Sequence, residues 1–147
     1  MLDKIKKLRD LTGAGMVDIK KALEKADGDE TKALEILRAR GQEKAEKKSD
    51  RVAGEGVVVS YTHPNGRIGS MVKLMCETDF VARNDDFKNL ARDIAMHVAA
   101  MNPEDTTVLL AQPFVKNPEI TVGDLIIQNI GKIGENIQVG EFLRMEI

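Results

Sequence analysis

The apolar residues of this 147-residue chain switch from helical to strand spacing across one charged stretch, and that switch limits the folds it can adopt. Up to residue 41 they recur every three or four positions, the period of an amphipathic helix. From residue 56 they alternate with polar residues, the period of a half-buried strand. The sequence therefore predicts an α+β chain with a helical head at 1–41, a charged linker at 42–55 and a core domain at 56–147.

The head is predicted to contain three short helices. The TGAG stretch at 12–15 ends the first, because two glycines so close together break helices and permit left-handed backbone. Met16 and Val17 are adjacent at the start of the second, so one of them should face the core and the other the surface. The third follows Asp29, a good N-cap, and Gly41 stands where a C-terminal cap is expected.

The core domain is predicted to begin with a hairpin and to end with a strand. Alternating runs at 57–61 and 68–76 flank His-Pro-Asn-Gly, in which Asn-Gly is the strongest short hairpin signal. Cys76 shares the inner face of the second run, so we interpret it as a small buried hydrophobe. The last strand, 137–147, changes parity at Gly140, which favours a bulge there.

Helices are predicted between these strands. One begins after Asn84 and stops at Asn102-Pro103. Another opens at Thr121 with capping-box spacing. Residues 103–119 hold three of the four prolines and should be mostly irregular. The expected result is a small antiparallel sheet with helices packed on one face.

Composition and charge argue against several classes of protein. No apolar run approaches the roughly 20 residues that span a bilayer, and MLDKIKKL lacks the apolar segment of a signal peptide, so we expect no membrane contact. The single cysteine fits a reducing cytoplasm. Residues 1–51 carry 14 Lys and Arg against 11 Asp and Glu, too small an excess to predict direct nucleic acid binding.

Signatures of catalysis, metals and cofactors are missing. Gly131-Lys132-Ile133-Gly134 lacks the spacing of a phosphate loop. His63 lies in a predicted turn and His97 on a predicted helix, so they make no metal constellation with the one cysteine. We interpret His97 as a partly buried structural residue, and we expect no enzyme, cofactor or metal site.

The stretch CETDFVARNDDF, residues 76–87, places Phe80 beside Asp79 in what should be a connecting turn. Two interpretations of Phe80 are open. Its ring could fold back under the following helix, or it could project outward as part of a partner-binding patch.

Several collinear stretches resemble the elongation factor Ts family. LRDLTGAGMVDIKKAL resembles its ubiquitin-associated-like head, TDFVARN its signature loop and KIGENIQV a later motif. SYTHPNGRIG, IAMHVAA and QPFVKNP are also similar to family stretches, so the resemblance covers nearly the whole chain. Many members of the family have a duplicated core, and this chain resembles the short class, which has one copy. Relatives of the short class have a long helical segment between IAMHVAA and QPFVKNP, where this chain has only residues 101–111.

The resemblance implies a guanine nucleotide exchange factor for the GTPase elongation factor Tu. It implies that the head docks on the GTPase through Arg9, Met16, Val17 and Lys20. It implies that a loop of this chain enters the partner near its magnesium and phosphate site. This loop is formed by Thr78, Asp79, Phe80 and Val81. It further implies core contacts from Ile133 and His63, and, because only one core copy fits, a symmetric homodimer.

Two other classes of function compete with this interpretation. The head alone would suit a ubiquitin-associated-type adaptor or protein-binding module without exchange activity, but such an adaptor would not need TDFVARN or the core domain. A small enzyme with a cryptic site would need clustered His, Cys or carboxylate groups, and the sequence offers no such cluster.

Overall fold

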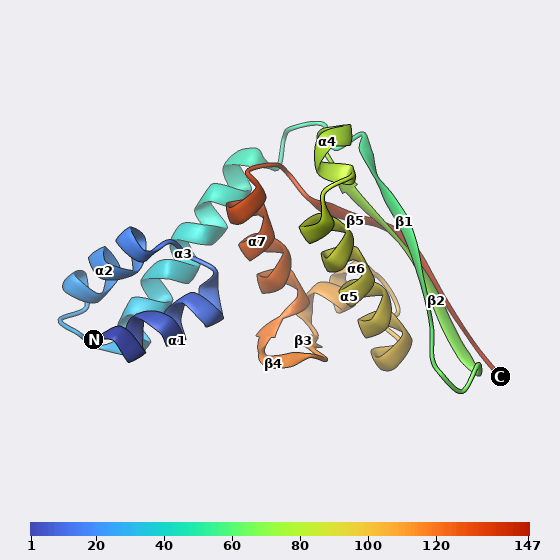
Figure 1. The fold of residues 1–147 in the computed structure, drawn as a ribbon, viewed down its shortest axis with the longest axis horizontal. Coiled ribbons are helices and arrows are strands. Elements are labelled where there is room, and N and C mark those ends of the chain that lie inside the picture. Colours follow the sequence, from blue (N-terminus) through green and yellow to red (C-terminus); the bar gives the residue numbers. More distant parts are fainter.

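The computed structural model describes residues 1–147, with three helices followed by an antiparallel sheet and its packed helices, which confirms the predicted α+β class (Figure 1). None of its helices has both the length and the apolar composition to cross a membrane. The elements in chain order are α1 (Leu2–Thr12), α2 (Met16–Lys25), α3 (Glu30–Lys48), β1 (Glu55–Thr62), β2 (Ile68–Cys76), α4 (Asp79–Ala82), α5 (Asp85–Met101), α6 (Thr106–Ala111), β3 (Pro113–Phe114), β4 (Asn117–Thr121), α7 (Val122–Ile133) and β5 (Gln138–Glu146).

The head helices α1, α2 and α3 enclose a hydrophobic cluster separate from that of the core domain. Gly13 ends α1 in the left-handed conformation, as the TGAG stretch predicts. The Asp29 carboxylate accepts from the amides of Thr31 and Lys32 at 2.9 and 3.1 Å and caps α3. The cluster comprises Ile5, Leu8, Ile19, Ala22, Leu23, Ala26, Ala33 and Leu37.

The predicted helix end at Gly41 is wrong, because α3 continues through this glycine to Lys48. A Cβ on Gly41 would stand 3.4 Å from Cγ2 of Ile127 on α7. The missing side chain therefore allows α3 and α7 to approach closely where head and core domain meet. The first half of the charged linker thus continues the last head helix (Figure 1), and Ala45 within it is half-buried against the core cluster.

The sheet has the order β1-β2-β5 with both pairs antiparallel, and the hairpin around Asn-Gly is confirmed. The β2–β5 register shifts between Val72 and Leu74, opposite Gly140, which confirms the predicted bulge. A Cβ on Gly140 would come within 2.9 Å of the Lys73 side chain, so the bulge also uses the small size of glycine.

One face of the sheet is covered by α5 and the helices beyond it, and no element covers the other face (Figure 1). The inner face buries Ser70, Val72, Leu74 and Cys76, which confirms the predicted parity of β2. Helix α5 is capped by Asn84 and ends at Asn102 as predicted. The uncovered face exposes the apolar side chains Val58, Met71, Leu143 and Met145.

The prediction that residues 103–119 are mostly irregular is wrong. Asp105 caps α6 by accepting from the Val108 amide at 2.8 Å. Beyond it, β3 and β4 pair as a short antiparallel hairpin. The prolines of this stretch occupy positions that need no amide donor, such as Pro113 at the start of the edge strand β3. They therefore do not prevent the helix and the hairpin from forming.

Candidate functional site

The TDFV segment, residues 78–81, is the start of a one-turn helix and not the irregular connecting turn that the sequence predicts. Thr78 lies in extended backbone and its hydroxyl accepts from the Val81 amide at 3.3 Å, which makes it the N-cap of α4. Glu135 and Arg83, which sequence analysis did not select, hold this short helix in place.

The two apolar side chains of the segment point in opposite directions. Val81 is half-buried and packs against the core cluster, and Ala82 is buried. Phe80 is 78% exposed, so the interpretation in which its ring folds back under the helix is wrong. The short helix therefore uses one face to anchor itself and the other to present an aromatic ring to solvent.

Asp79 and Phe80 share a partner in Arg83. The Arg83 guanidinium forms an ion pair with the Asp79 carboxylate four residues earlier. Its Cζ also lies 5.7 Å from the centroid of the Phe80 ring, within range of a cation–π contact. In the free protein the acidic group and the ring are thus already grouped on one exposed face.

The carboxylate of Glu135 receives three hydrogen bonds from the residues just before α4. Its Oε1 accepts from the amides of Glu77 and Thr78 at 3.0 and 3.1 Å, and its Oε2 accepts from the Thr78 hydroxyl at 2.7 Å. The sequence signal for Glu135 is its place after Gly134, which ends α7 in the left-handed conformation, but nothing in the sequence indicates the partner.

Asn136 ties the linker to the same place. Its buried amide group donates to the Arg51 carbonyl at 2.8 Å. Arg51 in turn lies 3.7 Å from the carboxylate of Glu77, the residue that precedes Thr78. The turn between α7 and β5 therefore bonds both to the linker, at Arg51, and to the residues just before α4.

The proposed head residues all lie on the surface. Met16 and Val17 are 47% and 65% exposed, so the prediction that one of them faces the core is wrong; both precede the first buried residue of α2. Lys20, one turn later, is exposed on the same helix, so these three can share a face. Arg9 is exposed in the last turn of α1.

The remaining two candidates lie apart from each other. Ile133, the last residue of α7, is half-buried against the core cluster and close in sequence to Glu135. His63 is exposed in the β1–β2 turn, where the Tyr61 hydroxyl lies 3.2 Å from its Nδ1. Since Thr78 follows the other end of β2, a nine-residue strand or about 30 Å separates His63 from the TDFV segment.

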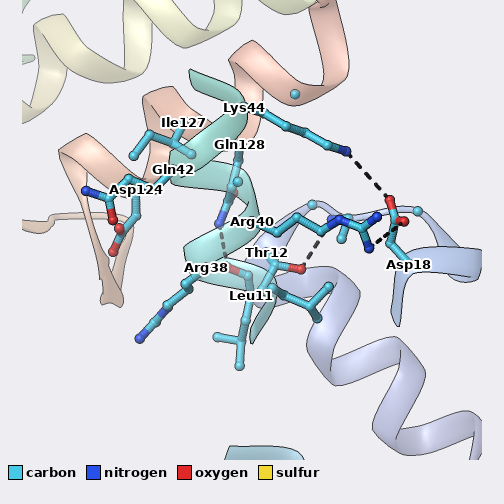
Figure 2. Close-up of a pocket in the computed structure, with 16 residues that line it drawn as sticks. Leu11, Thr12, Asp18, Arg38, Arg40, Gln42, Lys44, Asp124, Ile127 and Gln128 are labelled. Carbon is cyan, nitrogen blue, oxygen red and sulfur yellow. Dashed lines mark hydrogen bonds and ion pairs between the residues drawn. The ribbon is translucent and has the colours of Figure 1, made fainter. Parts of the chain in front are cut away.

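A cleft of about 270 Å³ lies between the head and α7 (Figure 2). No residue of the TDFV segment lines it. Its charges are largely paired, since Asp18 faces Arg40 at 3.2 Å and Lys44 at 3.8 Å. The Gln128 amide crosses it to donate to the Leu11 carbonyl. The cleft is therefore the seam between the two parts of the chain.

The one cysteine is unsuited to nucleophilic chemistry. Cys76 is buried, and burial together with the nearby Glu135 carboxylate raises the pKa of its thiol to about 11. Its burial confirms the predicted small buried residue, and its Sγ donates to the Thr78 carbonyl at 3.2 Å. The chain has no group of three or more His, Cys, Asp or Glu that could hold a metal ion.

Known proteins resemble this chain in sequence. Residues 77–147 match the family model described as Elongation factor TS. The chain is 44% identical to the elongation factor Ts of Carboxydothermus hydrogenoformans, with 97% of this chain and 87% of that relative covered. It is 43% identical to that of Fervidobacterium nodosum, with 97% and 95% covered. Each alignment spans 188 residues, so these relatives carry internal residues that this 147-residue chain lacks.

Proposed function

The chain belongs to the elongation factor Ts family, and from that premise we propose that it promotes GDP release and GDP/GTP exchange on elongation factor Tu in the cytoplasm. The TDFV segment carries the exchange step by entering the partner near its magnesium and phosphate site. The observation that carries the proposal is the Phe80 ring, which is 78% exposed. It stands on a short helix whose opposite face packs against the core cluster.

A wedge at that position suits the chemistry of GDP binding. Mg²⁺ bridges the phosphates of a bound nucleotide and requires near-ideal octahedral geometry, so a small displacement of its supporting helices weakens both ion and nucleotide. The exchange factor must bind the nucleotide-free GTPase better than the GDP-bound form. By reciprocity, GDP then weakens binding of the exchange factor by the same factor.

Each candidate residue has a place in this mechanism. Phe80 supplies the wedge, and Asp79 supplies hydrogen-bond acceptors or repulsion near the phosphates once it leaves Arg83. Thr78 and Val81 hold the wedge on the core domain. The docking contacts outside the segment come from Arg9, Met16, Val17, Lys20, Ile133 and His63.

The division of labour follows the division of the chain into a head at 1–41, a linker at 42–55 and a core domain at 56–147. Two separate hydrophobic clusters support this division, since each part has its own buried side chains. The head docks on the GTPase, and the core domain delivers the wedge.

The same protein acts as a symmetric homodimer that pairs through the uncovered face of the sheet. Support comes from the apolar side chains of that face, which include Met71 and Leu143 as direct cross-strand neighbours. A two-fold dimer uses the same patch on both copies, and an exposed apolar patch suits that use.

The central test is Phe80→Ala. Elongation factor Tu loaded with a fluorescent GDP analogue is mixed with rising concentrations of the protein, and the rate of GDP release at saturation is measured. We expect a fall of about tenfold or more, because only the wedge is removed. Its exposure predicts a change in the free energy of unfolding within about 0.5 kcal/mol.

Val52→Ala is the matched control, because Val52 is an apolar residue of the linker that is 84% exposed. It should keep the parent rate. A Phe80→Ala protein that folds and exchanges at the parent rate would refute the wedge. Binding of elongation factor Tu by the parent without any acceleration of GDP release would favour an adaptor.

A further inference from the structure

We propose that Glu135 is a positioning residue for nucleotide exchange: its carboxylate fixes the direction in which α4 presents Phe80. The inference rests on the function proposed above and extends it to a residue that lies outside the TDFV segment. It stands on three hydrogen bonds that join parts of the chain 57 and 58 residues apart.

Helix α4 needs an anchor because it is too short to be stable by itself. It has four residues, whereas isolated helices shorter than about 12 residues are marginal in water. Val81 and Ala82 hold its inner face against the core cluster. Packing along one face still leaves the N-terminal end of the helix free to tilt, and Phe80 lies at that end.

Glu135 removes that freedom by ordering the N-cap. An ionised carboxylate can only accept hydrogen bonds, so the Thr78 hydroxyl must donate its proton to Oε2 at 2.7 Å. The oxygen lone pairs of Thr78 are then left for the Val81 amide, which donates to them at 3.3 Å. The two amide donors at Glu77 and Thr78 fix the backbone just before the helix.

The carboxylate is itself held on a rigid support. Gly134 closes α7, with its amide donating to the Ile130 carbonyl at 2.8 Å and its backbone left-handed at φ 85°. Asn136, on the other side, is buried and bonded to the Arg51 carbonyl at 2.8 Å. The chain between α7 and β5 passes below α4 in the view of Figure 1. Glu135 lies in this stretch and reaches the start of the helix from a fixed point.

This arrangement predicts which step of exchange depends on Glu135. Most of the docking contacts proposed above lie on α1 and α2, and Glu135 bonds to none of them, so the concentration of protein that gives half-maximal release should change little. The rate at saturation depends on how Phe80 enters the partner, and should therefore fall when α4 can tilt. A merely structural residue would instead act through the amount of folded protein.

The test compares Glu135→Ala and Glu135→Gln with Thr121→Ala in the full chain. Thr121→Ala removes the capping box of α7, and so weakens a helix cap of the same kind at a site away from α4. GDP release from elongation factor Tu carrying a fluorescent GDP analogue gives the saturating rate and the half-maximal concentration. Amide hydrogen exchange by NMR on the free protein reports on Glu77 and Thr78.

For Glu135→Ala we expect a saturating rate about tenfold lower with the half-maximal concentration within about twofold of the parent. The Glu77 and Thr78 amides should exchange about tenfold faster or more, the scale of a lost charge-assisted hydrogen bond. Glu135→Gln keeps one acceptor oxygen for these amides and should restore part of the rate. Thr121→Ala should keep the parent rate at saturation.

The outcomes separate failure of this inference from failure of the proposed function. If Phe80→Ala slows release and Glu135→Ala does not, the wedge stands and the positioning role is overturned. A rate that falls equally in Glu135→Ala and Thr121→Ala also overturns it, because the effect is then general destabilisation. If Phe80→Ala itself leaves release unchanged, the proposed wedge fails and the positioning role falls with it.

Discussion

His97 lies fully buried on α5, and both of its ring nitrogens have partners. The Val115 amide donates to Nδ1 at 3.1 Å, so Nδ1 carries no proton. Nε2 must then carry the proton and donate to the Gln112 side-chain oxygen at 2.9 Å. The native structure thus requires the neutral ring. Burial lowers its pKa from 6.5, and the hydrogen bond to Gln112 opposes that shift.

We expect the stability of the protein to fall in mild acid because of this residue. Unfolded His97 binds a proton at higher pH than folded His97, so its contribution to the free energy of unfolding is complete above about pH 6.5 and is lost as the pH falls towards the lowered pKa. Urea unfolding between about pH 8 and 5 should show a stability advantage of the parent over His97→Gln that shrinks with acid.

His63→Gln is the control, since it removes the other histidine from an exposed turn. The loss of stability in acid is then compared between His97→Gln and His63→Gln, and it should be smaller in His97→Gln. A difference between parent and His97→Gln that stays constant across the range would show that protonation of His97 does not oppose folding.

At the residue scale, the sequence predicted which face of a strand or helix a residue occupies better than it predicted the residue's hydrogen-bond partners. Parity placed Cys76 on the inner side of β2, and it is buried there. The prediction from periodicity that Met16 or Val17 faces the core failed, because both residues precede the first buried residue of α2 and both are exposed. The role of Glu135 could not be predicted, since its partners are 57 and 58 residues away and only the fold brings them together.

At the element scale, glycine and proline were the main source of error. A glycine after a helical apolar stripe indicates either a helix end or a close contact between helices. Gly41 has the second role, since a Cβ added to it would lie 3.4 Å from Cγ2 of Ile127. The prolines of 103–119 suggested irregular backbone, although they occupy positions that tolerate them. Helix caps at Asp29, Asn84 and Thr121 were predictable because their signal is local.

Gly56 is the glycine whose size matters most within an element. It pairs with Met75 across the β1–β2 hairpin, and a Cβ there would stand 2.1 Å from the Leu74 carbonyl oxygen. We expect Gly56→Ala to lower the free energy of unfolding by about 2–3 kcal/mol or more, because two strand backbones must separate. Urea unfolding at neutral pH measures the change.

Gly131→Ala is the matched comparison. Gly131 lies within α7, and an added Cβ would meet nothing within 4 Å. A helical glycine with free space should gain up to about 1 kcal/mol on replacement by alanine. If both alanine variants changed stability alike, the contact at Gly56 would not be the reason for glycine at that position.

At the scale of the whole molecule, the change from helical to strand spacing was visible in the sequence, but the contact between the two hydrophobic clusters was not predictable. The charged stretch divides two apolar patterns, and two hydrophobic clusters lie on either side of it. The seam between them depends on single groups such as Gln128, which donates to the Leu11 carbonyl, and Arg38, 3.5 Å from the Glu119 carbonyl. Such long-range pairs leave no periodic signal in one sequence.

The uncovered sheet face leads to the last prediction, which concerns assembly. Met71 and Leu143 are cross-strand neighbours, both about half exposed, and Met145 beside them is 71% exposed. A second copy would cover these side chains, and a lysine ammonium in the buried centre of such an interface would lose its water without a partner. We therefore expect Leu143→Lys to convert a dimer to monomers in sedimentation velocity measurements.

Val52→Lys places the same charge on a residue of the linker that is 84% exposed, and it should leave the dimer intact. Because Leu143 is already half exposed in the single chain, Leu143→Lys should preserve the fold, and circular dichroism would confirm that the monomer is not an unfolded product. If the parent sediments as a monomer at all concentrations, the paired-sheet assembly is wrong. If Leu143→Lys remains dimeric, the two copies meet at another surface, and the apolar sheet face must be explained by a different partner.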